Sequence, residues 1–212
     1  MEHNEQNCHD QNCIEHTRHL GRRTYDGVEP MTNYGIFEDT MVVVKRNNQR
    51  KCLKINHVVP GDFILGFDLN NNQDVYNRVL EIQELEVAEE NQVRIWFKQG
   101  TYPDQFIIAA KGQQFDIHNY DLMNWDYRKA EELMSGTLIK GTLQDVSLNT
   151  IDSNCDMTGK FYMFILSGSR NFYVRKHEDE YDPKNPSTEE KDWSQGYKKD
   201  YEDFILVRGL KG

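Results

Sequence analysis

The 212-residue sequence has no long hydrophobic run and few cysteines. Its longest apolar stretches, such as residues 106–110, are far shorter than the roughly 18–20 residues that a membrane-spanning helix needs. The first residues, MEHNEQNCHD, lack the apolar core of a secretory signal. The four cysteines, Cys8, Cys13, Cys52 and Cys155, are too few to build a disulfide scaffold of this length. The sequence therefore predicts a cytoplasmic protein with reduced thiols.

An excess of positive charge is also lacking. The chain has 25 Lys and Arg against 35 Asp and Glu, which gives a net charge of −10. Nucleic acids and anionic membranes are polyanions, so the proteins that bind them need clustered cationic charge. We therefore expect no nucleic acid and no membrane among the main partners. The sequence also lacks the motifs GxxxxGK[ST], GxGxxG, GxSxG and HExxH, which mark common nucleotide-binding, hydrolase and metalloprotease sites.

The composition supports a folded core, and the chain divides into three zones. Hydrophobic residues make up 37% of the sequence and aromatic residues 11%, which excludes wholesale disorder. Residues 1–33 form a polar N-terminal arm with His and Cys, and residues 34–175 carry nearly all the apolar periodicity. Residues 176–212 form an acidic extension with a candidate last strand at 204–207.

The middle zone predicts an all-β fold. Short runs of β-branched, aromatic or alternating residues are separated by Gly, Asn and Asp, as is typical of strands joined by turns. These runs are residues 41–44, 52–55, 63–67, 75–82, 93–97, 106–110, 114–117, 146–151, 161–166 and 171–174. Cys52 lies in an alternating run and is predicted to be a core residue. One short helix is expected at residues 127–134, YRKAEELM, ending before Gly136.

Five segments of the middle zone resemble, in this order, the Hint domain, the autoprocessing module of inteins and Hedgehog C-terminal domains. They are GIFEDTMVVV (35–44), INHVVPGDFILGFD (55–68), IIAAKGQQFDI (107–117), WDYRKAEELMSGTLI (125–139) and FYMFILSGSRNFYV (161–174). The resemblance covers residues 34–175, about two thirds of the chain. It implies a horseshoe of curved strands with one short helix. The alternative is another small β-fold with a Pro-Gly turn.

The resemblance also implies where catalytic residues would stand. A Hint domain opens with a Cys or Ser that attacks the preceding carbonyl carbon, and the matching position here, in the block that contains Thr40, is Gly35. A Thr and a His then assist departure of the amide nitrogen, and the matching positions are Ala110 and Gln113. A Gln side chain forms hydrogen bonds but releases no proton near neutral pH. The closing His-Asn pair is not found, and His118 is expected on the surface.

The N-terminal arm offers a separate candidate site. Cys8, Cys13, His16 and His19 have the side chains that bind Zn²⁺. Their spacing, C-x4-C-x2-H-x2-H, fits no standard zinc finger. The alternative is a flexible polar terminus that carries these residues by composition. Zinc is therefore the one candidate cofactor.

Three functions remain open at this point. The first is a catalytically degenerate Hint-like module that serves as a structural or protein-interaction domain with an unknown protein partner, and is not an enzyme. The second is an active self-cleaving Hint domain whose nucleophile is displaced from position 35. The third is a small zinc-binding module. Trp125, which matches an aromatic position of the family, is predicted to pack in the fold.

Overall fold

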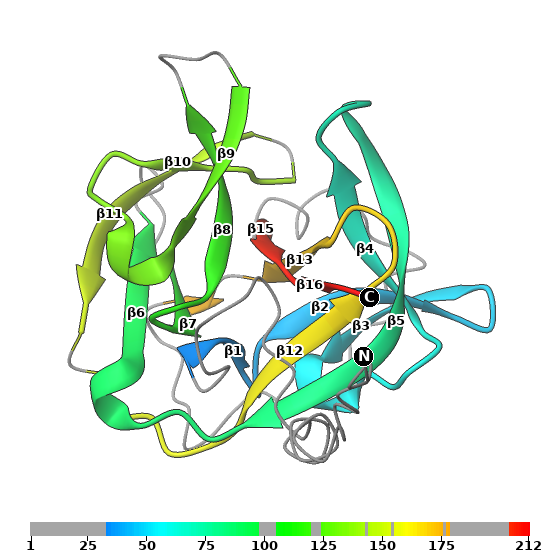
Figure 1. Ribbon diagram of the computed structural model, residues 1–212, viewed down its shortest axis with the longest axis horizontal. Helices are drawn as coiled ribbons and strands as arrows, with labels where there is room; N and C mark the ends of the chain where they lie inside the picture. Colours follow the sequence, from blue (N-terminus) through cyan, green and yellow to red (C-terminus); the bar gives the residue numbers. More distant parts are fainter. Residues whose placement is uncertain are drawn as a thin grey trace, which may run out of the picture. The chain divides into compact units, whose positions relative to one another are not determined.

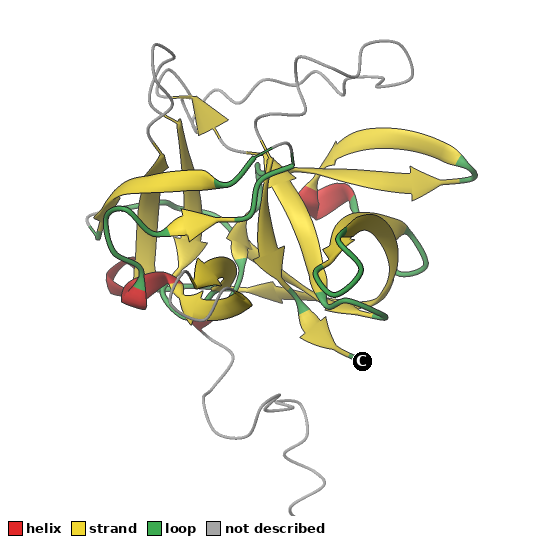
Figure 2. Ribbon diagram, turned by 90° about the horizontal axis from the view of Figure 1, so that it is seen from above, coloured by secondary structure: helices red, strands yellow, loops and turns green. Residues whose placement is uncertain are grey.

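The computed structural model describes residues 33–97, 105–119, 124–142, 144–153, 155–175, 177–178 and 204–212. The described residues belong to one compact unit, Thr32–Gly212. Strands dominate this unit, and its helical parts are single turns (Figure 2). None of the described helical turns has the length and apolar character needed to cross a membrane.

The described elements follow one another as short strands. The strands are β1 (Ile36–Phe37), β2 (Met41–Arg46), β3 (Gln49–Lys54), β4 (Phe63–Asp68), β5 (Gln73–Leu85), β6 (Gln92–Phe97), β7 (Gln105–Ala110), β8 (Gln114–Asn119), β9 (Asn124–Lys129), β10 (Leu138–Ile139), β11 (Val146–Asp152), β12 (Phe161–Leu166), β13 (Asn171–Arg175), β14 (His177–Glu178), β15 (Phe204–Arg208) and β16 (Leu210–Lys211). Turns of 3-10 helix are η2 (Ile55–His57), η3 (Glu89–Asn91) and η4 (Ala130–Glu132). The predicted all-β class is confirmed.

The described strands form one sheet that closes on itself. The order is β1-β12-β5-β4-β2-β13-β15-β8-β10-β11-β6-β7, and β1 also pairs with β7. In β1, Ile36 lies opposite both Tyr162 of β12 and Ala109 of β7. The long strand β5 pairs with β4 through its first half and with β12 through its second half. A strand shared in this way must curve, and Figure 1 shows β5 sweeping from the β4 hairpin round to β12.

The closed sheet surrounds the main apolar core, and two smaller clusters flank it. The main cluster draws on nearly every strand and includes Val44, Ile64, Phe115 and Phe164, all with no exposed surface. Full burial of one such side chain stabilises the fold by about 1.5–3 kcal/mol. Cys52 is 1% exposed and belongs to a second cluster, so its predicted place in the core is confirmed.

The prediction of a helix at residues 127–134 is wrong. Residues 124–129 form β9, which pairs residue by residue with β8 from Asn124 opposite Asn119 to Lys129 opposite Gln114. Only the single 3-10 turn η4 follows. A helix of about two turns is marginal on its own, because nucleation costs more than its few hydrogen bonds return. Six cross-strand pairs therefore outweigh the local helix preference of this segment.

The candidate last strand lies inside the sheet. β15 pairs with β13 on one side and with β8 on the other. The side chains of Phe204, Ile205, Leu206 and Val207 have no exposed surface. β15 thus belongs to the same closed sheet as the strands of residues 34–175.

Candidate functional site

Gly35, which stands directly before β1, is held against the β7–β8 turn by both of its backbone groups. Its N–H donates a hydrogen bond to Oε1 of Gln113 over 3.2 Å. Its carbonyl accepts a hydrogen bond from the N–H of Ala110 over 2.9 Å. Three positions that the sequence singled out, Gly35, Ala110 and Gln113, therefore meet at the buried backbone of Gly35: Gln113 binds the N–H of the peptide before it, and Ala110 binds the carbonyl of the peptide after it. The fourth, Thr40, lies elsewhere: its N–H donates to the carbonyl of Phe37 over 3.0 Å, which closes the turn after β1, and its carbonyl accepts the N–H of Ile55 over 2.8 Å.

Gln113 connects the start of the domain to its last strand. The side chain has no exposed surface. While its Oε1 faces Gly35, its Nε2 donates to the carbonyls of Arg208 over 2.8 Å and Gln114 over 2.9 Å. Both amide hydrogens thus have acceptors, as a buried amide requires. The side chain fixes geometry at this point and has no proton to give near neutral pH.

The backbone at position 35 favours glycine for two reasons. Gly35 has φ +118°, a conformation that side chains rarely allow. A Cβ built there would lie 3.0 Å from Cβ of Phe161 and 3.3 Å from the backbone N and O of Tyr162. A cysteine at this position would therefore meet both backbone strain and close contacts.

The described thiols are buried in apolar clusters. Cys155 packs in one cluster with Ala110, Phe37 and Phe161, which places it in the packing shell of the Gly35 region. Burial raises the pKa of the Cys155 thiol, against the opposing charge of Arg94. Because the thiolate is the nucleophile, a raised pKa lowers its reactivity.

The side chain of Arg208 also belongs to a polar network. Its Nε donates to Oδ1 of Asp116 over 2.6 Å, and the Asp116 side chain has no exposed surface. Asn171 donates to the other oxygen of Asp116 over 3.2 Å, and Asn77 donates to the Asn171 carbonyl over 2.8 Å. Burial raises the pKa of Asp116, while Arg208 and the Asn171 amide oppose that rise.

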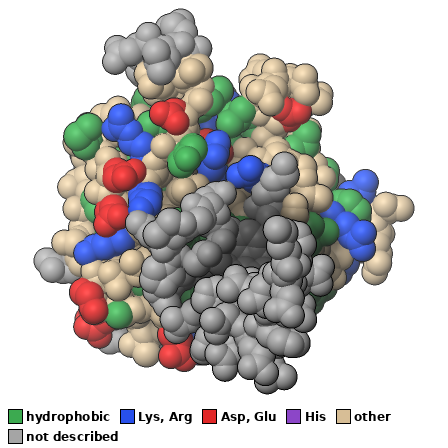
Figure 3. Space-filling model, viewed as in Figure 1, with side chains coloured by type: hydrophobic (Ala, Val, Ile, Leu, Met, Phe, Trp, Pro, Cys, Tyr) green, Lys and Arg blue, Asp and Glu red, His purple; other side chains and the backbone are tan. Residues whose placement is uncertain are grey.

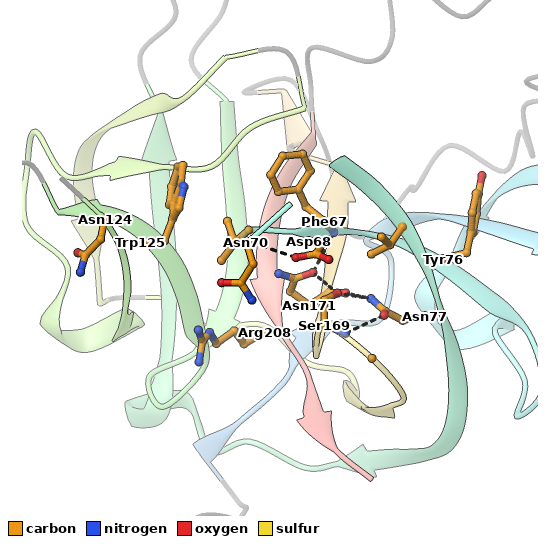
Figure 4. Close-up of a pocket in the computed structure, with 13 residues that line it drawn as sticks. Phe67, Asp68, Asn70, Tyr76, Asn77, Asn124, Trp125, Ser169, Asn171 and Arg208 are labelled. Carbon is orange, nitrogen blue, oxygen red and sulfur yellow. Dashed lines mark hydrogen bonds between the residues drawn. The ribbon is translucent and has the colours of Figure 1, made fainter. Parts of the chain in front are cut away.

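Asn77, Asn171 and Arg208 of this network line a pocket of about 980 Å³ (Figure 4). In the close-up, Asn171, Ser169 and Asn77 form a hydrogen-bonded row, with Arg208 below and Trp125 to one side. The polar side chains of the row bond to one another. The hydroxyl of Ser169 accepts a hydrogen bond from the Asn77 amide over 2.7 Å and donates one to Oδ1 of Asn171 over 3.0 Å. Asn171 also accepts the backbone N–H of Phe67 over 2.9 Å. These bonds tie β4, β5 and β13 together, which is a structural task.

Trp125, which lines this pocket, packs against His118. Trp125 of β9 and His118 of β8 meet edge to face with ring centroids 5.2 Å apart. Both are half-buried, so Trp125 packs in the fold as predicted.

The predicted zinc ligands Cys8, Cys13, His16 and His19 lie outside the described residues. Within the described residues, no group of three or more His, Cys, Asp or Glu side chains is arranged to hold a metal ion. Zinc binding by the N-terminal arm stays a prediction.

No known family model matches the sequence, and no curated protein matches it. Solved structures do match. A bacterial intein-like domain from Clostridium thermocellum superposes with a TM-score of 0.55 at 13% identity, covering 84% of this chain and 99% of that chain. An intein from a hyperthermophile gives 0.58 at 10% identity, covering 82% and 99%. A DnaB intein from Synechocystis sp. PCC 6803 gives 0.51 at 13% identity, covering 83% and 98%.

These likenesses define the class of the molecule by its fold. The chain has the Hint-like fold that inteins share, as the resemblance of its five segments implied. The sequence also pointed to Gly35, Ala110 and Gln113, which the structure brings together. It missed Arg208, whose carbonyl completes the surroundings of Gln113. The apolar run directly before Arg208 marks a buried strand, but its pairing with β8 has no local sequence signal.

Proposed function

We propose that this chain is a Hint-type domain that does not process itself and that serves as a structural or protein-interaction module. The observation that carries the proposal is the setting of Gly35: Gln113 accepts the N–H of the Tyr34–Gly35 peptide, and Ala110 donates to the Gly35 carbonyl in the next peptide. In self-processing, a thiol or hydroxyl attacks the preceding carbonyl carbon, and the amide nitrogen leaves with a proton. Gly35 brings no nucleophile, and Gln113 brings no acid.

The contact between Gln113 and Gly35 supports a holding role for this residue. A general acid would donate a proton toward the amide nitrogen. Here the amide N–H is itself the donor, and Oε1 of Gln113 is the acceptor. Such a bond stabilises the intact amide and gives the nitrogen no path to leave. The site therefore favours a stable peptide bond between Tyr34 and Gly35.

A displaced nucleophile is the competing proposal, and Cys155 is its best candidate among the described residues. The thiol packs beside Ala110, but burial raises its pKa. An acyl-carrying thiol needs the opposite environment, one that favours the thiolate. The packing of Cys155 therefore supports a core role.

Intact-mass spectrometry tests the proposal directly. Purified full-length protein is incubated with dithiothreitol or hydroxylamine, both of which release thioesters. We expect one species at full mass under all conditions. A fragment that begins at Gly35 contradicts the proposal. If such a fragment forms, the variant Cys155→Ser shows whether Cys155 is the nucleophile: loss of the fragment would identify it, and continued cleavage would exclude it.

A further inference from the structure

The β2–β3 hairpin gathers positive charge in a chain that is acidic overall. Residues 41–54 contain five Lys and Arg and no Asp or Glu, whereas the whole chain has a net charge of −10. The hairpin projects from the sheet (Figure 1). Figure 3 shows Lys and Arg side chains gathered beside hydrophobic ones at this edge of the molecule. The local charge is opposite to that of the chain as a whole.

The positions of these charges are fixed by strand register. Asn47 and Asn48 both have positive φ, 52° and 62°, as a two-residue type I′ turn requires. This turn places Lys45 opposite Arg50. Lys45 in turn lies opposite Phe63 of β4, which lies opposite Arg78 of β5. One row of directly paired residues thus crosses four strands on the same face of the sheet.

The row combines cations with exposed apolar groups. Phe63 is 44% exposed, and Val59 in the neighbouring turn is 49% exposed. The ring of Tyr76 lies 5.9 Å from Nζ of Lys45 and 5.5 Å from the guanidinium carbon of Arg50. Like charges directly opposite each other destabilise a strand pair, and contact with the shared ring offsets part of that cost.

A hollow of about 800 Å³ borders this row, and Lys45, Phe63, Val59 and Tyr76 are among its lining residues. Its far wall is fixed by Arg46, which donates to both carboxylate oxygens of Asp62 over 2.8 and 2.6 Å. That pair neutralises one hairpin cation.

We infer that the hairpin surface, defined by Lys45, Arg50, Phe63, Tyr76 and Arg78, binds an acidic peptide segment with a large apolar side chain. Carboxylates complement the three cations, and the apolar side chain fills the hollow against Phe63. Within the described strands β3 has β2 as its neighbour and no other, so an extended peptide can also pair along it. A polyphosphate ligand fits less well, because it has no apolar side chain to place in the hollow against Phe63.

This inference deepens the proposed function, since it rests on the domain working by binding and names the class of partner. The test is fluorescence anisotropy with the fluorescein-labelled peptide GEELEEFEELEG, full-length protein, and a control peptide in which every Glu is Gln. We expect saturable binding of the acidic peptide that weakens with added salt. We also expect Lys45→Glu to weaken it about tenfold and Phe63→Ser to weaken it at least about threefold.

Two control variants make changes of the same kind outside the hairpin surface. Lys111→Glu alters the net charge equally, and Met134→Ser removes an exposed apolar side chain, 62% exposed, from the η4 region. Both should bind within about twofold of the unchanged protein. Unaltered circular dichroism and melting temperature establish that each variant is folded, and Arg78→Glu, which also removes a cation from the hairpin surface, replaces Lys45→Glu where that variant is not folded.

Three outcomes overturn the inference: no saturation with the acidic peptide, equal losses in the control variants, or tighter binding of an oligouridylate of matched length. None of them bears on the mass test for self-processing. If a fragment forms while the peptide still binds, only the proposal that the domain does not process itself is contradicted. If the protein stays intact and the peptide does not bind, only the peptide site is contradicted.

Discussion

Gly35 and Gly136 both have positive φ, but they differ in what surrounds the missing Cβ. At Gly35 the nearest atom to an added Cβ lies at 3.0 Å, whereas at Gly136 no atom lies within 4 Å. Replacement by alanine should cost about 1–2 kcal/mol of unfolding free energy at Gly136 from backbone strain alone. At Gly35, overpacking adds about 1–3 kcal/mol. Urea unfolding of both variants measures the difference, and equal losses would show that the β1–β12 contact yields easily.

Gln113 binds the buried N–H of Gly35 and the partly buried carbonyls of Arg208 and Gln114. Gln113→Leu keeps much of the volume but leaves the Gly35 N–H and the Arg208 carbonyl without this partner. Each buried group left unsatisfied costs about 1–3 kcal/mol, so we expect a loss of about 3 kcal/mol in urea unfolding. The exposed Gln73 provides the control, since Gln73→Leu should change the free energy of unfolding by less than about 0.5 kcal/mol. Comparable losses in both variants contradict the holding role.

The ion pair of Asp116 and Arg208 makes stability depend on pH in a specific direction. Burial raises the pKa of Asp116, and Arg208 opposes that rise. In Arg208→Met the pKa should rise further, so the folded state binds the proton at a pH where the unfolded state, with a model value of 3.8, has lost it. The stability of the variant then falls as pH rises through that window.

The expected loss for Arg208→Met is about 3–5 kcal/mol near pH 7, because a buried carboxylate is left without its counter-charge. The loss should shrink as the pH falls toward 5. Urea unfolding of the unchanged and variant proteins across this range measures it. The double variant with Asp116→Asn removes the titrating group and should abolish the extra pH dependence. A loss that grows in acid contradicts the assignment.

Among the elements, β15 has the largest consequence for the fold. It lies between β13 and β8, and four consecutive side chains are fully buried. A chain ending after Asp203 lacks this strand and should not unfold cooperatively, since two neighbouring strands lose their ladder partner. A chain ending after Arg208 keeps β15 and loses only β16 and the end. Thermal denaturation followed by circular dichroism compares the two, and a cooperative transition in the shorter chain would show that β15 is dispensable.

The sequence predicted most strands because alternation and β-branching mark which segments bury one face. It failed at residues 127–134, where Ala, Glu and Leu favour a helix locally while pairing with β8 decides the outcome. It also could not place β15, because its partners β8 and β13 are far from it in sequence. Gly35, Ala110 and Gln113 were found through motif order, whereas Arg208 contributes a backbone carbonyl that no side-chain pattern reveals.

The whole sheet depends on pairings between distant parts of the chain, such as β1 with β12 and β15 with β8. Loop-closure entropy is lost before such contacts form, so folds of this kind take about milliseconds to seconds. We expect stopped-flow refolding from urea in this range, followed by Trp fluorescence. A main phase in microseconds would indicate that local hairpins dominate the transition state.

The circuit of strands closes through β1, which has only two residues. Its ladders to β12 and β7 comprise only two residue pairs and one residue pair. The chain before Gly35 leads directly into this join. Tension applied from that side would load these three residue pairs first and peel β1 away, before it reached β15, which lies between β13 and β8. Mechanically the domain has a seam, and the seam lies where the preceding polypeptide is attached.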